Sequence, residues 1–299
     1  RPPVVVAGVV PLTISSRDTA PFGMGLAPSP VLNRLRNRLL EKAAAAVLAE
    51  GEALAQRIHQ DLHGTPMPGG VLDWQRRADA IAQFTVPELE YPRSDAPEHL
   101  HFLGPINASG SAAPLPEWWS DLDGTVPVVH VTQGTVANAD YDQAIAPALV
   151  GLADLDALVV VATGGRPLDT LPPLPPNARA AAFLPYDELL PKTDVFVTNG
   201  GYGGVHYALR YGVPVVATGG KEDKPEVGAR IAWSGVGRRL RTERPSPSAL
   251  GREVRRVLSR PRYRETAQRI AERMRAAPGL PGLERIVDDL VAAGSDGRP

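Results

Sequence analysis

The stretch that decides the fold covers residues 183–224 and reads FLPYDELLPKTDVFVTNGGYGGVHYALRYGVPVVATGGKEDK. The β-rich apolar run 194–198 leads directly into a glycine-rich turn, residues 199–204, and a helical pattern follows. A second apolar run, residues 213–218, precedes a polar loop. This order predicts a strand, turn, helix and strand of a parallel sheet, with the turn at the carboxyl end of the strands. Backbone N–H groups at the start of the helix would suit a phosphate group there.

The same alternation extends along much of the chain and predicts an α/β fold with a parallel sheet. Buried strands are predicted at residues 126–131, 158–162, 180–184, 195–198, 213–217 and 237–240. Helices are predicted between them at residues 141–152, 186–190, 203–211 and 225–233. Two Arg-rich amphipathic helices and a last helix follow at residues 247–259, 263–277 and 283–293.

The first third of the chain has fewer strand signals. Strands are predicted at residues 4–10, 80–86 and 101–103, and a mostly helical segment at 31–62 with Gly51 as a break or bend. Because a doubly wound half needs five or six strands, we expect a partial domain that lacks its opening strands. The predicted organisation begins with a partial N-terminal domain at residues 1–105 and a linker rich in small residues and proline at 106–120. A complete second domain follows at 121–277, and a C-terminal helix at 278–299 returns to the first domain.

Composition excludes several classes of protein. The chain has 299 residues, a formal net charge of −1 and no cysteine, which argues against a general nucleic-acid partner, disulfides and thiolate metal sites. No apolar run approaches the ~20 residues of a membrane span, and the first residues show no initiator Met and no signal-peptide pattern. We therefore expect a cytoplasmic protein without a membrane span, whose sequence starts in mid-protein.

The register of residues 183–224 resembles the donor-binding signature of family 1 glycosyltransferases of the macrolide type. In that family the order is aromatic-x-Pro-Gln, Thr-His-x-Gly-x-x-Ser-x-x-Glu, Gly-Val-Pro and Asp-Gln. Here the family His, Ser, Glu and Gln are replaced by Asn199, Gly204, Tyr207 and Lys224. The resemblance implies a GT-B fold, which has two Rossmann-like domains, with the donor-binding C-terminal domain complete and the N-terminal domain partial.

The resemblance also implies a donor site on two glycine-bearing turns and the loop after the next strand. Gln133-Gly134-Thr135 follows a predicted strand; the alternative is an ordinary strand-to-helix turn with Asn138 or Asp140 as the N-cap. The predicted donor-binding residues are Gly134, Thr135, Phe183, Pro185, Tyr186, Asn199, Gly200, Gly201, Gly203, Gly204, Val205, Glu222, Asp223 and Lys224.

Two of these predictions leave alternatives open. Phe183 either stacks on the nucleobase or is a core aromatic at the end of a strand. The acidic pair Glu222 and Asp223 either accepts hydrogen bonds from sugar hydroxyls or is an ordinary surface pair. No catalytic residue is assigned, because the family's base is a His near the N-terminus and the first thirty residues contain no Gly-His pair.

The expected function is transfer of a hexose from a nucleotide-diphospho-sugar to the hydroxyl of a small, polyketide-like acceptor, by inverting displacement. No cofactor or metal is expected: His59 and His63 have the i, i+4 spacing of metal ligands on a helix, but no Cys or third His accompanies them in the segment. Backbone N–H groups would stabilise the departing diphosphate. The alternatives are a GT-B epimerase, a lipid-linked sugar transferase, and a nucleotide-sugar-binding fragment or auxiliary protein without turnover. Without a base, the chain is expected to bind donor but to transfer sugar poorly.

Overall fold

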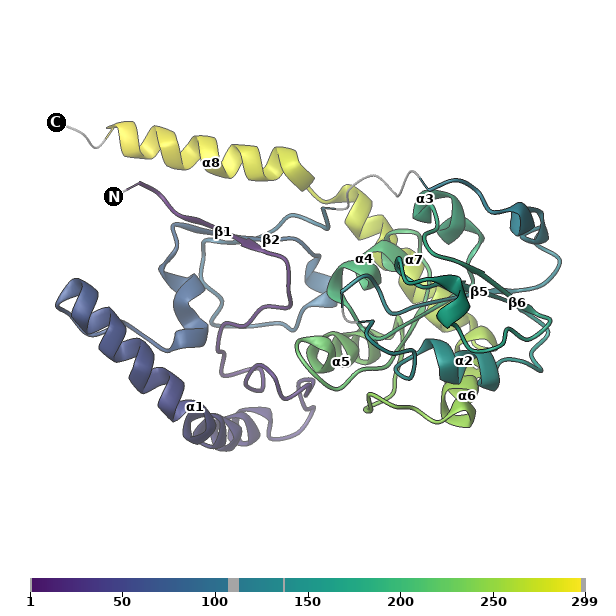
Figure 1. The fold of residues 1–299 in the computed structure, drawn as a ribbon. Helices are drawn as coiled ribbons and strands as arrows, with labels where there is room; N and C mark the ends of the chain where they lie inside the picture. Colours follow the sequence, from purple (N-terminus) through teal and green to yellow (C-terminus); the bar gives the residue numbers. More distant parts are fainter. Residues whose placement is uncertain (1, 107–112, 137, 297–299) are drawn as a thin grey trace. The chain divides into compact units, whose positions relative to one another are not determined.

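The chain forms two compact units, which are described separately. The computed structural model in Figure 1 describes residues 2–106, 113–136 and 138–296. Unit 1 comprises Arg1–Gly104 together with Ala277–Pro299, and unit 2 comprises Pro105–Ala276. Residues 107–112 of the predicted linker lie outside the described residues. Both units contain parallel sheets, so the predicted α/β fold is confirmed.

Unit 2 contains a six-stranded parallel sheet with the strand order β6-β5-β4-β7-β8-β9. In chain order its strands are β4 (Val128–Thr132), β5 (Leu158–Ala162), β6 (Ala178–Ala181), β7 (Val195–Thr198), β8 (Val215–Ala217) and β9 (Gly237–Arg239). Strand order reverses between β4 and β7, the first and fourth strands of the unit. The loops that follow these two strands therefore diverge and leave a crevice at the carboxyl edge of the sheet.

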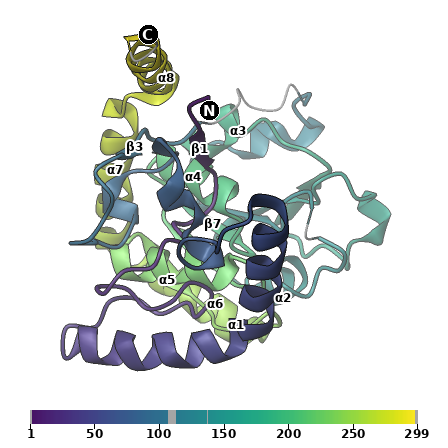
Figure 2. The same cartoon turned by 90° about the vertical axis from the view of Figure 1, so that its left-hand side faces the viewer.

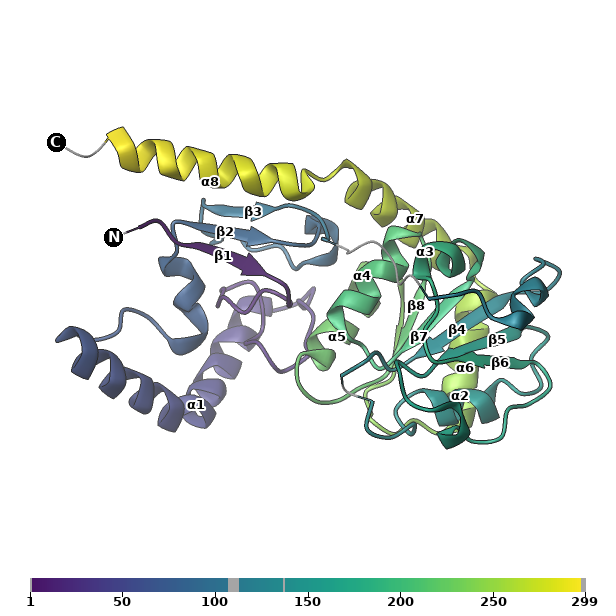
Figure 3. The same cartoon turned by 45° about the horizontal axis from the view of Figure 1, so that its top comes forward.

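Helices cover both faces of this sheet, as Figure 3 shows. They are α2 (Ile145–Gly151), α3 (Tyr186–Leu189), α4 (Tyr202–Arg210), α5 (Lys224–Ser234), α6 (Pro247–Leu258) and α7 (Pro261–Ala276). Side chains of β4 contribute to two hydrophobic clusters. Val129 and Val131 pack in one cluster with residues of α2 and α6, and Val128 packs in the other with Leu184 and Leu189. Burial on both faces explains why the strands read as continuous apolar runs.

Two predicted elements of unit 2 were wrong in their bounds. Strand β6 ends at Ala181, so Phe183 does not end a strand, and its side chain is 49% exposed rather than part of the core. Helix α2 begins at Ile145 instead of residue 141, and neither Asn138 nor Asp140 caps it. The Gln133 side chain does so instead, because its Oε1 accepts hydrogen bonds from the N–H groups of Ala144 and Ile145 at 3.0 and 3.1 Å.

Unit 1 contains a three-stranded parallel sheet in the order β1-β2-β3, formed by β1 (Val5–Gly8), β2 (Ala80–Gln83) and β3 (Leu100–Phe102). Helix α8 (Gly279–Asp296) lies along this sheet (Figure 3). Leu283 and Ile286 of α8 pack against a small core of Ala82, Phe84 and Leu103. The Gly279 N–H also donates to the Leu103 carbonyl at 2.7 Å, which attaches the end of the chain to the end of β3.

Helix α1 (Asn33–His63) is the longest element and is almost entirely exposed. The sequence predicted a break or a bend at Gly51. The helix continues through Gly51, so it is not broken there, and Figure 2 shows α1 bending, so that its two halves run in different directions. Asn37 is its one buried residue among those described, at 0% exposure. Polar contacts therefore dominate the attachment of α1 to its unit.

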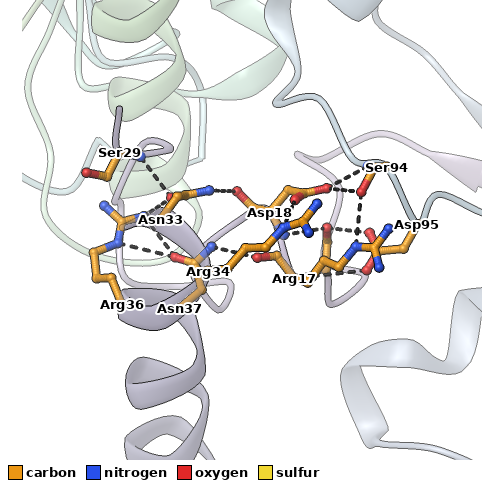
Figure 4. Close-up of polar contacts among 10 residues, drawn as sticks. Arg17, Asp18, Ser29, Asn33, Arg34, Arg36, Asn37, Ser94 and Asp95 are labelled. Carbon is orange, nitrogen blue, oxygen red and sulfur yellow. Dashed lines mark hydrogen bonds and ion pairs between the residues drawn. The ribbon is translucent and has the colours of Figure 1, made fainter. Parts of the chain in front are cut away.

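A polar cluster joins three segments of unit 1 (Figure 4). Asp18 accepts hydrogen bonds from the Ser94 hydroxyl and backbone N–H at 2.5 and 2.7 Å, and Asp95 accepts one from the Ser16 hydroxyl at 2.5 Å. Asn33 at the start of α1 donates to the Asp18 carbonyl at 2.6 Å. Segments that lie about 75 residues apart in the sequence are thereby fastened together at both carboxylates.

The ionised form of Asp18 is strongly favoured. The hydrogen bonds from Ser94, together with Arg34 at 3.1 Å, lower the pKa of Asp18 from its ordinary value of 3.8 to about 2. A carboxyl whose pKa is lower in the folded chain stabilises the fold above its unfolded pKa, and this contribution is lost as the pH falls through the folded value.

We predict that Asp18→Asn lowers the stability of unit 1 at pH 7 by about 1 kcal/mol, since it removes charge-assisted hydrogen bonds at a partly exposed site. The difference from the native chain should shrink between pH 3.8 and pH 2, where Asp18 itself becomes protonated. Thermal melting at pH 7, 4 and 2 measures this. Asp61→Asn on the exposed face of α1 is the control, and an undiminished difference at pH 2 would contradict the assignment.

Candidate functional site

A cavity of about 380 Å³ lies at the carboxyl edge of the unit 2 sheet. It is bounded by the loops after β4, β5 and β6 and by the first turns of α3 and α4. This is the switch point of the strand order, where open α/β sheets bind their ligands. Six predicted donor-site residues line it, although they lie up to 70 positions apart in the sequence: Gly134, Thr135, Phe183, Tyr186, Gly203 and Gly204.

The first turn of α4 presents bare backbone to this cavity. Gly201 is the N-cap residue with extended backbone, and a Cβ at Gly201 or Gly203 would meet no atom within 4 Å. The first N–H groups of a helix have no partner within the helix, and the helix dipole makes this end electropositive. Val205 differs, because its N–H donates to the Gly201 carbonyl at 3.1 Å and its side chain is buried. Of the predicted residues in this turn, Gly203 and Gly204 therefore remain to contact an anion in the cavity.

The loop after β4 approaches the loop after β5 so closely that residue 164 has no room for a side chain. A Cβ on Gly164 would lie 2.0 Å from the Gly134 carbonyl oxygen, and both residues have positive φ, 68° and 73°. The Asn138 amide donates to the carbonyls of Gly134 and Thr163 at 3.0 and 3.2 Å, which fixes this approach. Thr135 is left exposed at the cavity wall.

Aromatic side chains form the remaining wall. The Phe183 ring lies across Gly165, where a Cβ would meet its Cζ at 2.7 Å, and half of the ring surface stays open. Tyr186 lies edge-on to Tyr207, with ring centroids 5.6 Å apart, and its hydroxyl hydrogen-bonds to Thr132. Thr132 and Tyr207 also line the cavity, although neither was predicted from the sequence. For Tyr207 the sequence did hold a signal, because it replaces the Glu of the family pattern.

The groups around the cavity floor are uncharged at neutral pH. Burial raises the pKa of the Tyr186 phenol from 10.0 to about 12. His130, which lies beneath it with ring centroids 5.3 Å apart, is fully buried on β4, and burial lowers its pKa to about 4. Its Nδ1–H donates to the Val160 carbonyl at 2.8 Å. A flat apolar ring next to neutral hydroxyls suits a nucleoside.

Asn199 is placed differently from the prediction of a direct phosphate contact. Its side chain is only 2% exposed, and its amide donates to the Gln133 carbonyl at 3.0 Å and to Gln143 Oε1 at 3.3 Å. The Gln133 side chain in turn caps α2 and donates to the Asp140 carbonyl at 2.6 Å. Asn199 therefore joins the end of β7 to the end of β4.

The acidic loop after β8 does not line the cavity. Glu222 is exposed, Asp223 is the N-cap residue of α5 without a side-chain cap, and Lys224 is buried. Burial raises the pKa of Asp223, whereas the hydrogen bond from Lys224 lowers the pKa of Glu222. The predicted residues outside the cavity are Pro185, Asn199, Gly200, Gly201, Val205, Glu222, Asp223 and Lys224.

Unit 1 has a cavity of its own, of about 440 Å³. Ala44, Ala45 and Leu48 of α1 form one wall, and the loop after β1 forms another, including Ala20 and Phe22. The loop is the one that the Asp18 cluster fastens in place. The lining is mostly apolar, which suits an apolar molecule.

The part of the chain that the structure describes contains no group of three or more His, Asp or Glu side chains placed to hold a metal ion. The rings of His59 and His63 are tilted by 47° with their centroids 4.6 Å apart, and His59 Nδ1 hydrogen-bonds to the Thr65 carbonyl at 2.8 Å. None of the described helices is long and apolar enough to cross a membrane.

Comparisons with known proteins agree with this architecture. The family profile described as "Erythromycin biosynthesis protein CIII-like, C-terminal domain" matches residues 147–292. The chain is 43% identical over 93% of its length to "4'-demethylrebeccamycin synthase" of Lentzea aerocolonigenes and spans 66% of that protein. It is 32% identical over 95% of its length to "UDP-glucosyltransferase B1" of Starmerella bombicola and spans 68% of it.

A solved structure, the glycotransferase of kitacinnamycin, superimposes with a TM-score of 0.68 at 22% identity, covering 86% of this chain and 67% of its own. This likeness concerns the fold. The sequence relatives also show the family. The protein from Starmerella bombicola is more than 30% identical to this chain, and the chain spans more than two thirds of its length. The chain belongs to the family 1 glycosyltransferases of GT-B fold, related to the macrolide glycosyltransferases.

Proposed function

We propose that unit 2 binds the nucleoside diphosphate of a nucleotide-sugar donor in the cavity at the switch point. The base stacks on Phe183, the ribose lies against Tyr186 and Tyr207, and the diphosphate meets the first turn of α4 and Thr135. The observation that carries the proposal is the meeting of an exposed aromatic ring and a bare helix N-terminus across one 380 Å³ cavity. One relative is named a UDP-glucosyltransferase, which favours uridine as the nucleoside.

The proposed reaction transfers a hexose to an acceptor hydroxyl with inversion. The acceptor oxygen attacks the anomeric carbon opposite the diphosphate and gives up its proton to a base, and the bond from that carbon to the diphosphate oxygen breaks. Negative charge that develops on the leaving diphosphate is stabilised by the N–H groups of Gly203 and Gly204 and by the α4 dipole. No residue of this chain is assigned as the base. Binding of the donor without turnover is the second candidate, and it makes the same use of the cavity.

We propose further that the acceptor's apolar part binds in the unit 1 cavity. The name of the relative from Lentzea aerocolonigenes indicates a natural-product acceptor, and the alanine-rich wall of α1 leaves room for such a molecule. The loop after β1 lies at the carboxyl end of a parallel strand, as the donor loops do in unit 2.

Phe183→Ala is predicted to weaken UDP and uridine by a similar factor of about tenfold, roughly 1.4 kcal/mol, because the stacking surface for the base is lost. Titration calorimetry with both ligands measures this. Leu174→Ala, which truncates another exposed apolar residue of unit 2 away from the cavity, should leave both affinities unchanged. If the Phe183→Ala chain binds uridine as tightly as the native chain does, the base does not stack on Phe183.

Asn199→Asp is predicted to weaken UDP about tenfold and to leave uridine unaffected. A carboxylate would face the Gln133 carbonyl instead of donating to it, and this would push apart the two loops that hold the diphosphate. Asn177→Asp is the matched control, since its amide also donates to backbone carbonyls but away from the cavity. Equal losses for UDP and uridine would show that Asn199 supports the whole domain rather than the phosphate loops.

Ala45→Phe is predicted to fill the unit 1 cavity and to abolish binding of an apolar polycyclic aglycone, with UDP affinity unchanged. Ala46→Phe, one residue further along α1 and outside the cavity lining, is the control. Fluorescence titration of a panel of planar aromatic aglycones reads out the effect. If both variants bind the aglycone as the native chain does, the acceptor site lies elsewhere.

A further inference from the structure

Lys224 is a buried cation in a place where burial is costly. It is the first residue of α5, and it is 7% exposed. Lysine is almost never fully buried unless it is paired. A positive charge is also unfavourable in the first turn of a helix, because the dipole makes that end electropositive. The position therefore calls for an anion beside the ammonium group.

The carboxylate that the structure places there is a weak partner. Glu222 Oε2 lies 2.8 Å from Lys224 Nζ, but 64% of the Glu222 side chain is exposed to solvent. Ion pairs with an exposed carboxylate contribute little, because water competes with them. Glu222 also has a φ of 56°, which is uncommon for a residue other than glycine. The contact is therefore poorly suited to be the permanent partner of Lys224.

Lys224 packs on the turn that leads into α4. A Cβ on Gly200 would lie 3.5 Å from the Lys224 Cβ, and one on Gly219 would lie 3.0 Å from the same atom. The lysine stem thus covers both glycines, and Gly201 next to them is the N-cap residue of α4. Since a lysine stem is flexible, rotation about its bonds can direct Nζ from Glu222 toward the start of α4.

We propose that Lys224 is the counter-charge for the donor's diphosphate and that Glu222 is an internal competitor that holds the ammonium group until the donor binds. This rests on the proposed diphosphate site at the first turn of α4. A diphosphate carries more charge than one carboxylate and accepts several hydrogen bonds, so it displaces Glu222. The same cation then opposes the charge that grows on the diphosphate as the sugar leaves.

A purely structural ion pair makes a different prediction from a competitor. If Glu222 and Lys224 only hold the loop together, removing either partner disturbs the loop in the same way. If Glu222 competes with the diphosphate, removing its charge tightens binding, whereas removing the Lys224 charge weakens it. The two substitutions therefore have opposite signs only under the proposal.

The experiment is calorimetric titration of UDP and uridine into the native chain, Glu222→Gln and Lys224→Met, at low and at 0.5 M salt, about the ionic strength that screens exposed charges. Lys224→Met is expected to weaken UDP at least tenfold and Glu222→Gln to tighten it about threefold, with uridine unchanged in both. The effects should shrink at the higher salt concentration. Lys221→Met is the control, because Lys221 lies in the same loop, is 78% exposed and pairs with Glu243 at 3.0 Å.

The exposed Glu222→Gln substitution keeps the test decisive even if Lys224→Met fails to fold, which melting curves would show. Weaker or unchanged UDP binding by a folded Glu222→Gln chain would show that Glu222 does not compete with the diphosphate for Lys224. UDP binding by a folded Lys224→Met chain that equals the native affinity overturns the counter-charge. If the native chain itself does not bind UDP, the proposed function fails and this inference fails with it.

Discussion

The hydrogen bond from the Asn199 amide to the Gln133 carbonyl is the constraint on which the candidate site depends. It joins the ends of β4 and β7 at 3.0 Å, at the point where the strand order reverses and the following loops would otherwise separate. Gln133 also connects the end of β4 to α2, because its side chain caps that helix. One buried amide therefore positions the Gly134 loop against the glycine turn before α4, and the cavity between them is the consequence.

Charge is distributed unevenly around this site. The cavity floor is neutral, since burial keeps His130 deprotonated and Tyr186 protonated at ordinary pH. Positive potential comes from backbone at the start of α4 and, in our proposal, from Lys224, which packs on the glycine turn before α4. Such an arrangement binds an uncharged nucleoside at one end and its diphosphate at the other. Differences between ligands with and without phosphate therefore separate the two halves of the site.

The sequence predicted the fold well and named some of the residues that line the cavity, for physical reasons. Buried parallel strands are apolar along their whole length, so β4, β5 and β7 were visible as runs, and glycines marked the turns after them. Asn199 was predicted to contact the ligand, because nothing local to it indicates that its partners are Gln133 and Gln143, more than 50 residues away. The cap of α2 was missed for the same reason, since Gln133 acts across eleven residues.

The most direct test of the proposed donor site is an amide NMR titration of the chain with UDP and, separately, with uridine. We predict that UDP shifts the N–H signals of Thr135, Gly203 and Gly204 far more than uridine does. Both ligands should shift the Gly165 and Phe183 signals equally, because the base lies there in both complexes. Shifts from UDP that leave the first turn of α4 untouched, or that cluster in another part of unit 2, would contradict the account.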